Sequence, residues 1–208
     1  MLIAREESIK KDKEGQVINT EIDQNSTALV VIDLQKGITA MPAEPYSSEV
    51  VVSNAAQIAQ AFRRHNLPVF LVHVGPSADM KDGLKPVSDQ AMQMSGPLPD
   101  DWMNFMPELG PEKTDFIIHK RQWGAFYGTE LDLQLRRRKI ETIVLCGIST
   151  NIGVESTARF AYEYGYRQIF VSDACSARSR AEHDFSMSVI FPRIGQVRKT
   201  ADILQALK

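Results

Sequence analysis

The residues of this chain that could do chemistry stand at the ends of apolar runs. Asp33 closes the run 27–33, and Lys120 closes the run 115–120. A charged side chain at such a position is costly unless water or an opposite charge compensates it. If both runs are parallel strands of one sheet, their carboxyl ends share an edge and the two charges meet in one pocket. Such a pair can move a proton during catalysis, or it can be a structural ion pair only.

A turn between an apolar run and a helical pattern supplies a third element. The glycines Gly147 and Gly153 bracket it, after the run 142–146 and at the start of the pattern 151–164. Backbone N–H groups at a turn from strand to helix bind anions and stabilise oxyanions. An acid, a lysine and an oxyanion turn at one edge would form a catalytic site.

Three further side chains each have a chemical and a plain interpretation. His73 ends the run 68–74 and could contact a substrate, but no aspartate with paired histidines follows it, so we expect no metal ion and no other cofactor. Cys175 lies just past the run 168–172. It is either a nucleophile or, as we favour, a small packed side chain. Cys146 lies inside a run and is expected in the core.

Strand-length apolar runs alternate with amphipathic stretches of helix length along the chain. This alternation predicts an α/β fold with three αβα layers and a six-stranded, mostly parallel, Rossmann-like sheet. The expected strands are 27–33, 68–74, 115–120, 142–146, 168–172 and 195–198, and the expected helices are 50–65, 129–139, 151–164, 181–191 and 201–207.

Two segments do not follow the alternation. Residues 1–26 are charged and are expected to form an N-terminal arm, which leaves 27–208 as the globular domain. Residues 75–114 are rich in proline, methionine and glycine, and a loop of this length is usually a functional lid or an interaction surface.

Bulk properties exclude several classes of protein. The 208 residues carry a net charge of −2, and the pI is about 6.1, so no basic surface indicates a nucleic-acid partner. No apolar stretch has the length of a membrane span, and the N-terminal residues lack the apolar core of a signal peptide. Two cysteines form no disulfide framework. We therefore expect a cytoplasmic protein with a small-molecule substrate.

Four separated stretches, in the same order, resemble the isochorismatase-like hydrolases, also called the cysteine hydrolase superfamily. They are ALVVIDLQ, HKRQWGAFYGTELDLQLR, CGISTNIGVESTAR and FVSDACSA. The resemblance covers the segment 27–207. It implies Asp33 as general acid or base, Lys120 as its charge partner, and an oxyanion hole formed by the N–H groups of Ser149 and Gly153. It also implies a cis peptide bond between Ile148 and Ser149.

Gly153 departs from most of that family. The resemblance implies a cysteine nucleophile at this position, which attacks an amide carbonyl after the aspartate has removed its proton. Isochorismatases resemble this chain in having glycine there, and they cleave a vinyl ether instead. In that mechanism a carboxylic acid protonates the enol-ether carbon, and water traps the resulting oxocarbenium ion. Asp33 would be the acid, and Lys120 would orient it.

The residues around this core of the site receive more open assignments. Gln35 would position water or a substrate carboxylate, and Arg121 is one candidate for binding that carboxylate. Trp123, Phe126 and Tyr127 either line a pocket for a planar ring or pack against a neighbouring subunit, because family members form dimers to octamers. We therefore expect a homo-oligomer.

Three hypotheses about function remain. The first is a hydrolase without a cysteine nucleophile, which cleaves a small carboxylated enol ether. The second is a hydrolase of amide or other C–N bonds that uses activated water or Cys175. The third is a non-catalytic binding protein on the same scaffold, in which Asp33 and Lys120 could be replaced without loss of turnover.

Overall fold

The computed structural model describes residues 20, 22–90 and 98–208. Six strands form one sheet in the order β3-β2-β1-β4-β5-β6, and the described pairings are parallel. The predicted α/β class and the six-stranded sheet are therefore confirmed. The strands are β1 (Thr27–Ile32), β2 (Val69–Val74), β3 (Phe116–Lys120), β4 (Thr142–Ile148), β5 (Arg167–Ser176) and β6 (Gln196–Arg198).

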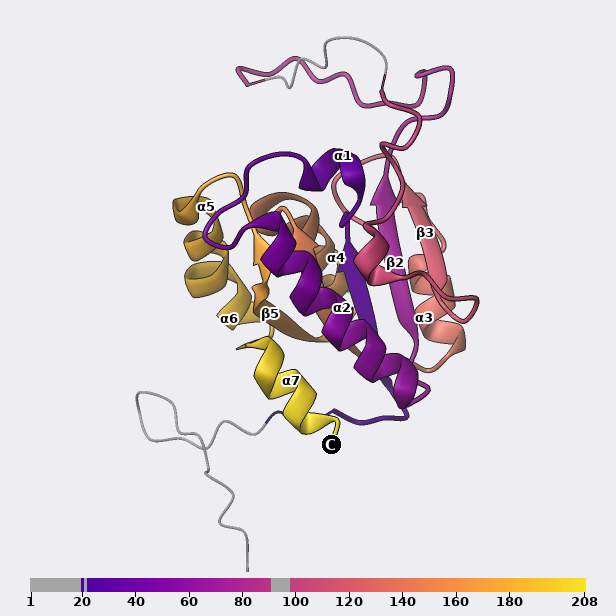
Figure 1. The fold of residues 1–208 in the computed structure, drawn as a ribbon, viewed down its shortest axis with the longest axis vertical. Coiled ribbons are helices and arrows are strands. Elements are labelled where there is room, and N and C mark those ends of the chain that lie inside the picture. Colours follow the sequence, from indigo (N-terminus) through magenta and orange to yellow (C-terminus); the bar gives the residue numbers. More distant parts are fainter. Residues whose placement is uncertain (1–19, 21, 91–97) are drawn as a thin grey trace, which may run out of the picture.

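Helices cover both faces of this sheet (Figure 1). The long helix α2 (Ser48–Arg64) and the last helix α7 (Thr200–Ala206) lie on one face, while α3 (Leu131–Arg137) and α4 (Glu155–Glu163) lie on the other. The remaining helical turns are α1 (Lys36–Thr39), η1 (Pro107–Leu109), η2 (Thr150–Val154), α5 (Arg180–Phe185), η3 (Ser186–Ile190) and α6 (Phe191–Ile194). Central strands covered on both faces explain why β1 is buried at every residue.

The apolar periodicity of α2 explains its position. Its buried side includes Val51, Ala55, Ile58 and Phe62, which recur at helical spacing and pack against the core of the sheet. The helix begins where the Ser47 side chain accepts a hydrogen bond from the Val50 N–H. Among the described residues, no helix is long and apolar enough to cross a bilayer.

Several elements differ from the expectation: the helices expected at 151–164 and 181–191 include the π-helical turns η2 and η3, and η1 was not predicted. Strand β5 runs on to Ser176, four residues past its predicted end, because an irregularity in its pairing with β4 resets the register between Leu145 and Gly147. Helix α1 was not expected, and it is only one turn long. Residues 1–19 and 21 of the expected arm, and 91–97 of the expected lid, lie outside the described residues.

The described part of the long loop returns to the end of β1. Phe105 pairs with Gln35 in an isolated β-bridge, and the Lys36 and Gly37 N–H groups donate to the carbonyls of Asn104 and Trp102. We call the segment 102–106 the strap. It fits there because the Trp102 ring occupies the space that a Cβ at Gly37 would fill. The chain next to Asp33 is thus fixed by a segment far away in sequence.

Candidate active site

Asp33 and Lys120 lie in contact at the carboxyl ends of β1 and β3. The Lys120 Nζ atom is 2.7 Å from Asp33 Oδ2, and the two residues are 1% and 5% exposed. Asp33 has a positive φ of 54°, a conformation that aspartate tolerates better than most residues. The sequence prediction that these two charges meet is confirmed.

The hydrogen bonds of this pair are unequally distributed. Lys120 Nζ donates to Asp33 Oδ2 and also to the carbonyls of Gln122 and Trp123, at 3.2 and 2.6 Å, so all three of its donors are used. Asp33 Oδ1 is buried and has no hydrogen-bond partner among the described residues. An unpaired buried oxygen is costly, so this atom is the one of the two carboxyl oxygens whose hydrogen-bonding capacity is unused.

Burial also changes the acidity of this carboxyl group. It raises the pKa of Asp33 to about 6, because removal from water disfavours the charged form more than Lys120 favours it. A carboxyl group of this kind is present in both protonation states near neutral pH. It can therefore act as a general acid or as a general base.

Gly153 lies directly against the pair. A Cβ atom built at this residue would be 3.1 Å from Asp33 Oδ2, 3.0 Å from Ile32 Cγ2 and 3.5 Å from Lys120 Nζ. A side chain at this residue would crowd the carboxyl group, so glycine is what lets the turn approach it this closely. The peptide bond between Ile148 and Ser149 is cis, as the family resemblance implies, and the π-helical turn η2 carries Gly153.

One hydroxyl group connects the Gly153 turn to the loop that holds Lys120. Thr157 Oγ1 donates to the Gly153 carbonyl at 2.7 Å and accepts from the Ala125 N–H at 3.1 Å. Ala125 lies two residues after Trp123, whose carbonyl binds Lys120. Sequence reasoning missed this role of Thr157, because a threonine inside a helical pattern gives no signal of a long-range bond.

Gln35 has partners that differ from the expected substrate contact. Its side-chain amide donates to the carbonyls of Val74 and Trp102 and accepts from the Val74 N–H. Both amide N–H groups are therefore committed to the backbone. The structure supports a positioning role, in which Gln35 joins the ends of β1 and β2 to the strap.

The aromatic side chains after Lys120 differ in their exposure to solvent. Trp123 and Tyr127 are 61% and 71% exposed, as a ring-binding wall or an interface would require. Phe126 was expected with them, but it is 4% exposed and stacks on Tyr166, so it belongs to the core. The loop turns it inward, where its ring contacts those of Tyr164 and Tyr166. Arg121 forms an ion pair with Asp82, so its charge is already matched within the chain.

The two cysteines lie in the core. Both are fully buried, and burial raises the pKa of Cys146 well above its usual range and that of Cys175 to about 12. A thiol in this state is neither charged nor accessible, which disfavours Cys175 as a nucleophile. His73 stacks near Phe105 and bonds the Met103 carbonyl through Nδ1, so it lies beneath the strap.

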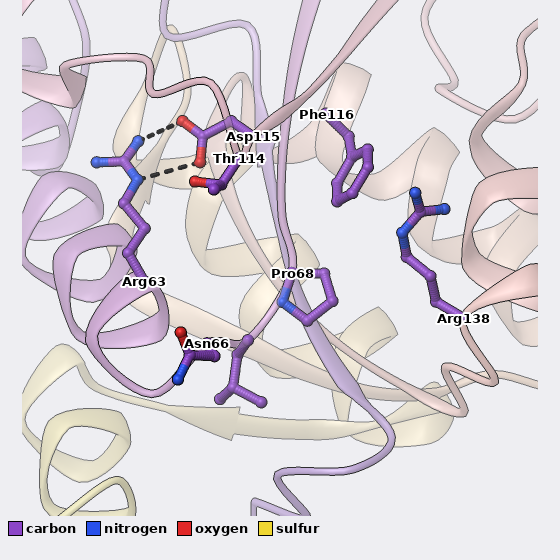
Figure 2. A pocket seen from close by; sticks show the side chains of 8 residues that line it. Arg63, Asn66, Pro68, Thr114, Asp115, Phe116 and Arg138 are labelled. Carbon is purple, nitrogen blue, oxygen red and sulfur yellow. Dashed lines mark hydrogen bonds and ion pairs between the residues drawn. The ribbon is translucent and has the colours of Figure 1, made fainter.

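A surface pocket of about 270 Å³ lies elsewhere, at the opposite end of β2 and β3 (Figure 2). Its arginine Arg63 is bound to Asp115 at 2.6 Å, and Arg138 stacks over the Phe116 ring at 3.8 Å. Parallel sheets bind ligands at the carboxyl ends of their strands, and this pocket is at the amino ends. The Asp33 edge is therefore the candidate site, and this pocket is not.

The fold is a parallel α/β sheet with a buried carboxyl group and its lysine partner at the carboxyl ends of the strands. The isochorismatase domain model matches residues 27–202, and the chain belongs to the isochorismatase family and is a hydrolase. It is 52% identical to the isochorismatase family protein YwoC of Bacillus subtilis, over 92% of this chain and 100% of that protein. It is 27% identical to the ureidoacrylate amidohydrolase RutB of Acinetobacter baylyi, over 93% of this chain and 91% of that one.

A solved structure supports the same assignment. An isochorismatase family protein from Burkholderia thailandensis is similar with a TM-score of 0.86 and 46% identity, over 90% of this chain and 97% of that chain.

Proposed function

We propose that this protein hydrolyses the vinyl ether of a small, carboxylated enol ether, with Asp33 as the general acid. One observation carries the proposal. The Asp33 carboxyl group is buried with one oxygen that has no partner among the described residues, and its pKa is raised to about 6. The isochorismatase domain match is consistent with this reaction.

The reaction needs no nucleophilic side chain. Protonated Asp33 gives its proton to the terminal carbon of the enol ether, and the electron pair of the C=C bond forms the new C–H bond. The ether oxygen stabilises the cation as an oxocarbenium ion. Water adds to the cationic carbon and returns a proton to Asp33. The hemiketal hydroxyl group then loses its proton as the C–O bond breaks, and the departing oxygen takes up a proton, which releases a keto acid and an alcohol.

The remaining parts of the site have supporting roles in this proposal. Lys120 keeps Asp33 Oδ2 occupied, so that Oδ1 faces the substrate. The N–H groups of Ser149 and Gly153 would bind the substrate carboxylate or a developing negative charge. The exposed rings of Trp123 and Tyr127 offer surface for a planar substrate or for a second subunit. The substrate carboxylate would meet Arg121 only if that residue leaves Asp82.

Hydrolysis of a C–N bond is the second candidate, and the similarity to an amidohydrolase favours it. With glycine at residue 153 and both thiols buried, the nucleophile would be a water molecule activated by ionised Asp33. The two candidates use opposite protonation states of one carboxyl group.

An assay of the purified protein with isochorismate, beside a panel of small amides, tests the proposal. We expect release of pyruvate from isochorismate, and loss of that activity in Asp33→Ala. Turnover of an amide without turnover of isochorismate would favour the second candidate. If neither isochorismate nor any amide is turned over, and Asp33→Ala binds these compounds as the wild type does, the result would favour a non-catalytic binding protein.

A further inference from the structure

We propose that His183 is a positioning residue for the reaction: through Thr150 it fixes how closely the Gly153 turn covers Asp33. The inference rests on the proposed function for its meaning in catalysis, but the contact itself stands on geometry. His183 lies in α5, thirty-three residues from Thr150 along the chain. Helix α5 is at the same end of the sheet as α1, near the carboxyl ends of the strands (Figure 1).

The contact between these residues is buried on both sides. Thr150 Oγ1 and His183 Nδ1 are 2.9 Å apart, and both residues are buried. Burial lowers the pKa of His183, which favours the neutral ring, and the ring and the hydroxyl group can then share one proton. Its charged neighbours are Arg180 and Asp184 on its own helix, while Tyr46 meets the ring edge-on from the segment before α2.

A second bond ties the same two parts of the molecule together. Ser186 Oγ, at the start of η3, donates to Glu155 Oε2 at 2.6 Å. Thr150 is the first residue of η2, and Glu155 directly follows the last residue of η2. The turn that carries Gly153 is therefore held at both ends by α5 and η3. The Gly153 carbonyl also accepts a hydrogen bond from the Thr157 hydroxyl group in α4.

Helix α5 is itself well fixed, so it can serve as the reference for this turn. Its Ser179 N-cap accepts from the Glu182 N–H, and the Glu182 side chain accepts from the Ser179 N–H in return. This capping box stabilises the first turn of a helix too short to be stable alone. A fixed helix and a short bond give the Gly153 turn one position.

The position of the Gly153 turn determines how much water reaches the Asp33 carboxyl group. The Gly153 backbone lies close enough that an added Cβ would meet Asp33 Oδ2 at 3.1 Å, and Lys120 is the charged group facing this carboxyl. If the turn moves outward, water reaches the carboxyl group and stabilises its charged form. The pKa of Asp33 would then fall from about 6 toward its usual value. A merely structural bond would not change this titration.

The test uses variants that remove or keep the bond. Thr150→Val removes the hydroxyl group at nearly constant shape, Thr150→Ser keeps it, and His183→Leu removes the partner. Tyr166→Phe is the matched control, because it removes a 2.8 Å bond to Asp132 that lies away from the site. The first readout is the Asp33 carboxyl titration by carbon-13 NMR, assigned with Asp33→Asn, and it needs no substrate. The second is the pH profile of kcat and KM with isochorismate.

We expect Thr150→Val and His183→Leu to lower the pKa of Asp33 by about one unit, since a partly hydrated carboxyl regains much of its usual acidity. The value of kcat at pH 7 should fall about tenfold, with KM within about twofold, and Thr150→Ser should restore both. An unchanged Asp33 titration in both disruptive variants, with a loss of stability like that of Tyr166→Phe, would overturn the proposal. Absence of isochorismate turnover in the wild type would overturn the proposed function, while the titration would still decide the role of His183.

Discussion

The pH dependence of kcat/KM separates the two candidate reactions at Asp33. With a pKa of about 6, this group is protonated in about 10% of molecules at pH 7. An aspartate with the usual value of 3.8 would be protonated in about 0.06%, so burial raises the supply of acid about 150-fold. If Asp33 donates a proton to an enol ether, kcat/KM should be level below about pH 5 and fall about tenfold per pH unit above about pH 6.

The assay is discontinuous measurement of pyruvate from isochorismate between pH 4.5 and 8.5, with enzyme-free samples at each pH to subtract spontaneous decay. Asp33→Asn keeps an acceptor for Lys120 but has no acidic proton, so kcat/KM should fall on the order of 10² to 10⁴. Asp132→Asn, on the exposed side of α3, is the matched control and should keep the wild-type profile. A profile that rises through pH 6 to a plateau would refute the acid role and indicate a base.

The other predictions concern neighbours of this carboxyl group and its effect on stability. Gly153→Ala would place a Cβ 3.0 Å from Ile32 and 3.1 Å from Asp33, so we expect a loss of about 1–3 kcal/mol in unfolding free energy, measured with urea, and a kcat at least about tenfold lower. Lys120→Met removes the charge that lowers the pKa of Asp33, so the falling limb of the profile should move above pH 6 while kcat drops; a limb that stays in place would contradict the pairing. Cys175→Ala should keep kcat within about twofold, whereas inactivation would restore the thiol hypothesis. Because the pKa of Asp33 is raised in the folded state, its contribution to the unfolding free energy is full below about pH 3.8 and is lost as the pH rises through about 6; thermal denaturation of Asp33→Asn should lack this decrease.

The sheet and the Asp33–Lys120 pair were predictable because strong local signals determine them. Continuous apolar runs in a parallel sheet are buried on both faces. A charge at the end of such a run is costly unless water or an opposite charge compensates it, so the two charges are expected to pair. The length of β5 was not predictable, since its last residues follow an irregularity in the pairing with β4 that leaves no periodic trace. The same limit applies to α1, whose single turn is fixed by contacts with the strap.

Roles that depend on long-range contacts were the hardest to predict. Phe126 follows Lys120 in an aromatic loop, and nothing in its neighbours distinguishes a ring that lines a pocket from one that turns inward to Tyr166. The Gln35 side-chain amide can form hydrogen bonds with a substrate as readily as with backbone groups, so the sequence does not distinguish the two roles. In the sequence Thr150 lies in a turn and His183 in a predicted helix, and only the fold brings them within 2.9 Å.

The Gln35 amide has a consequence for how new specificities could arise on this scaffold. It holds Val74, where the chain leaves the sheet, and Trp102, where the chain returns to it. The intervening stretch is therefore a loop whose two ends are pinned at one point, and the entropy of closing such a loop rises only slowly with its length. We therefore expect that this stretch can be exchanged in the laboratory while the acid and its lysine stay in place, and that such exchange is a way to test whether it influences substrate preference.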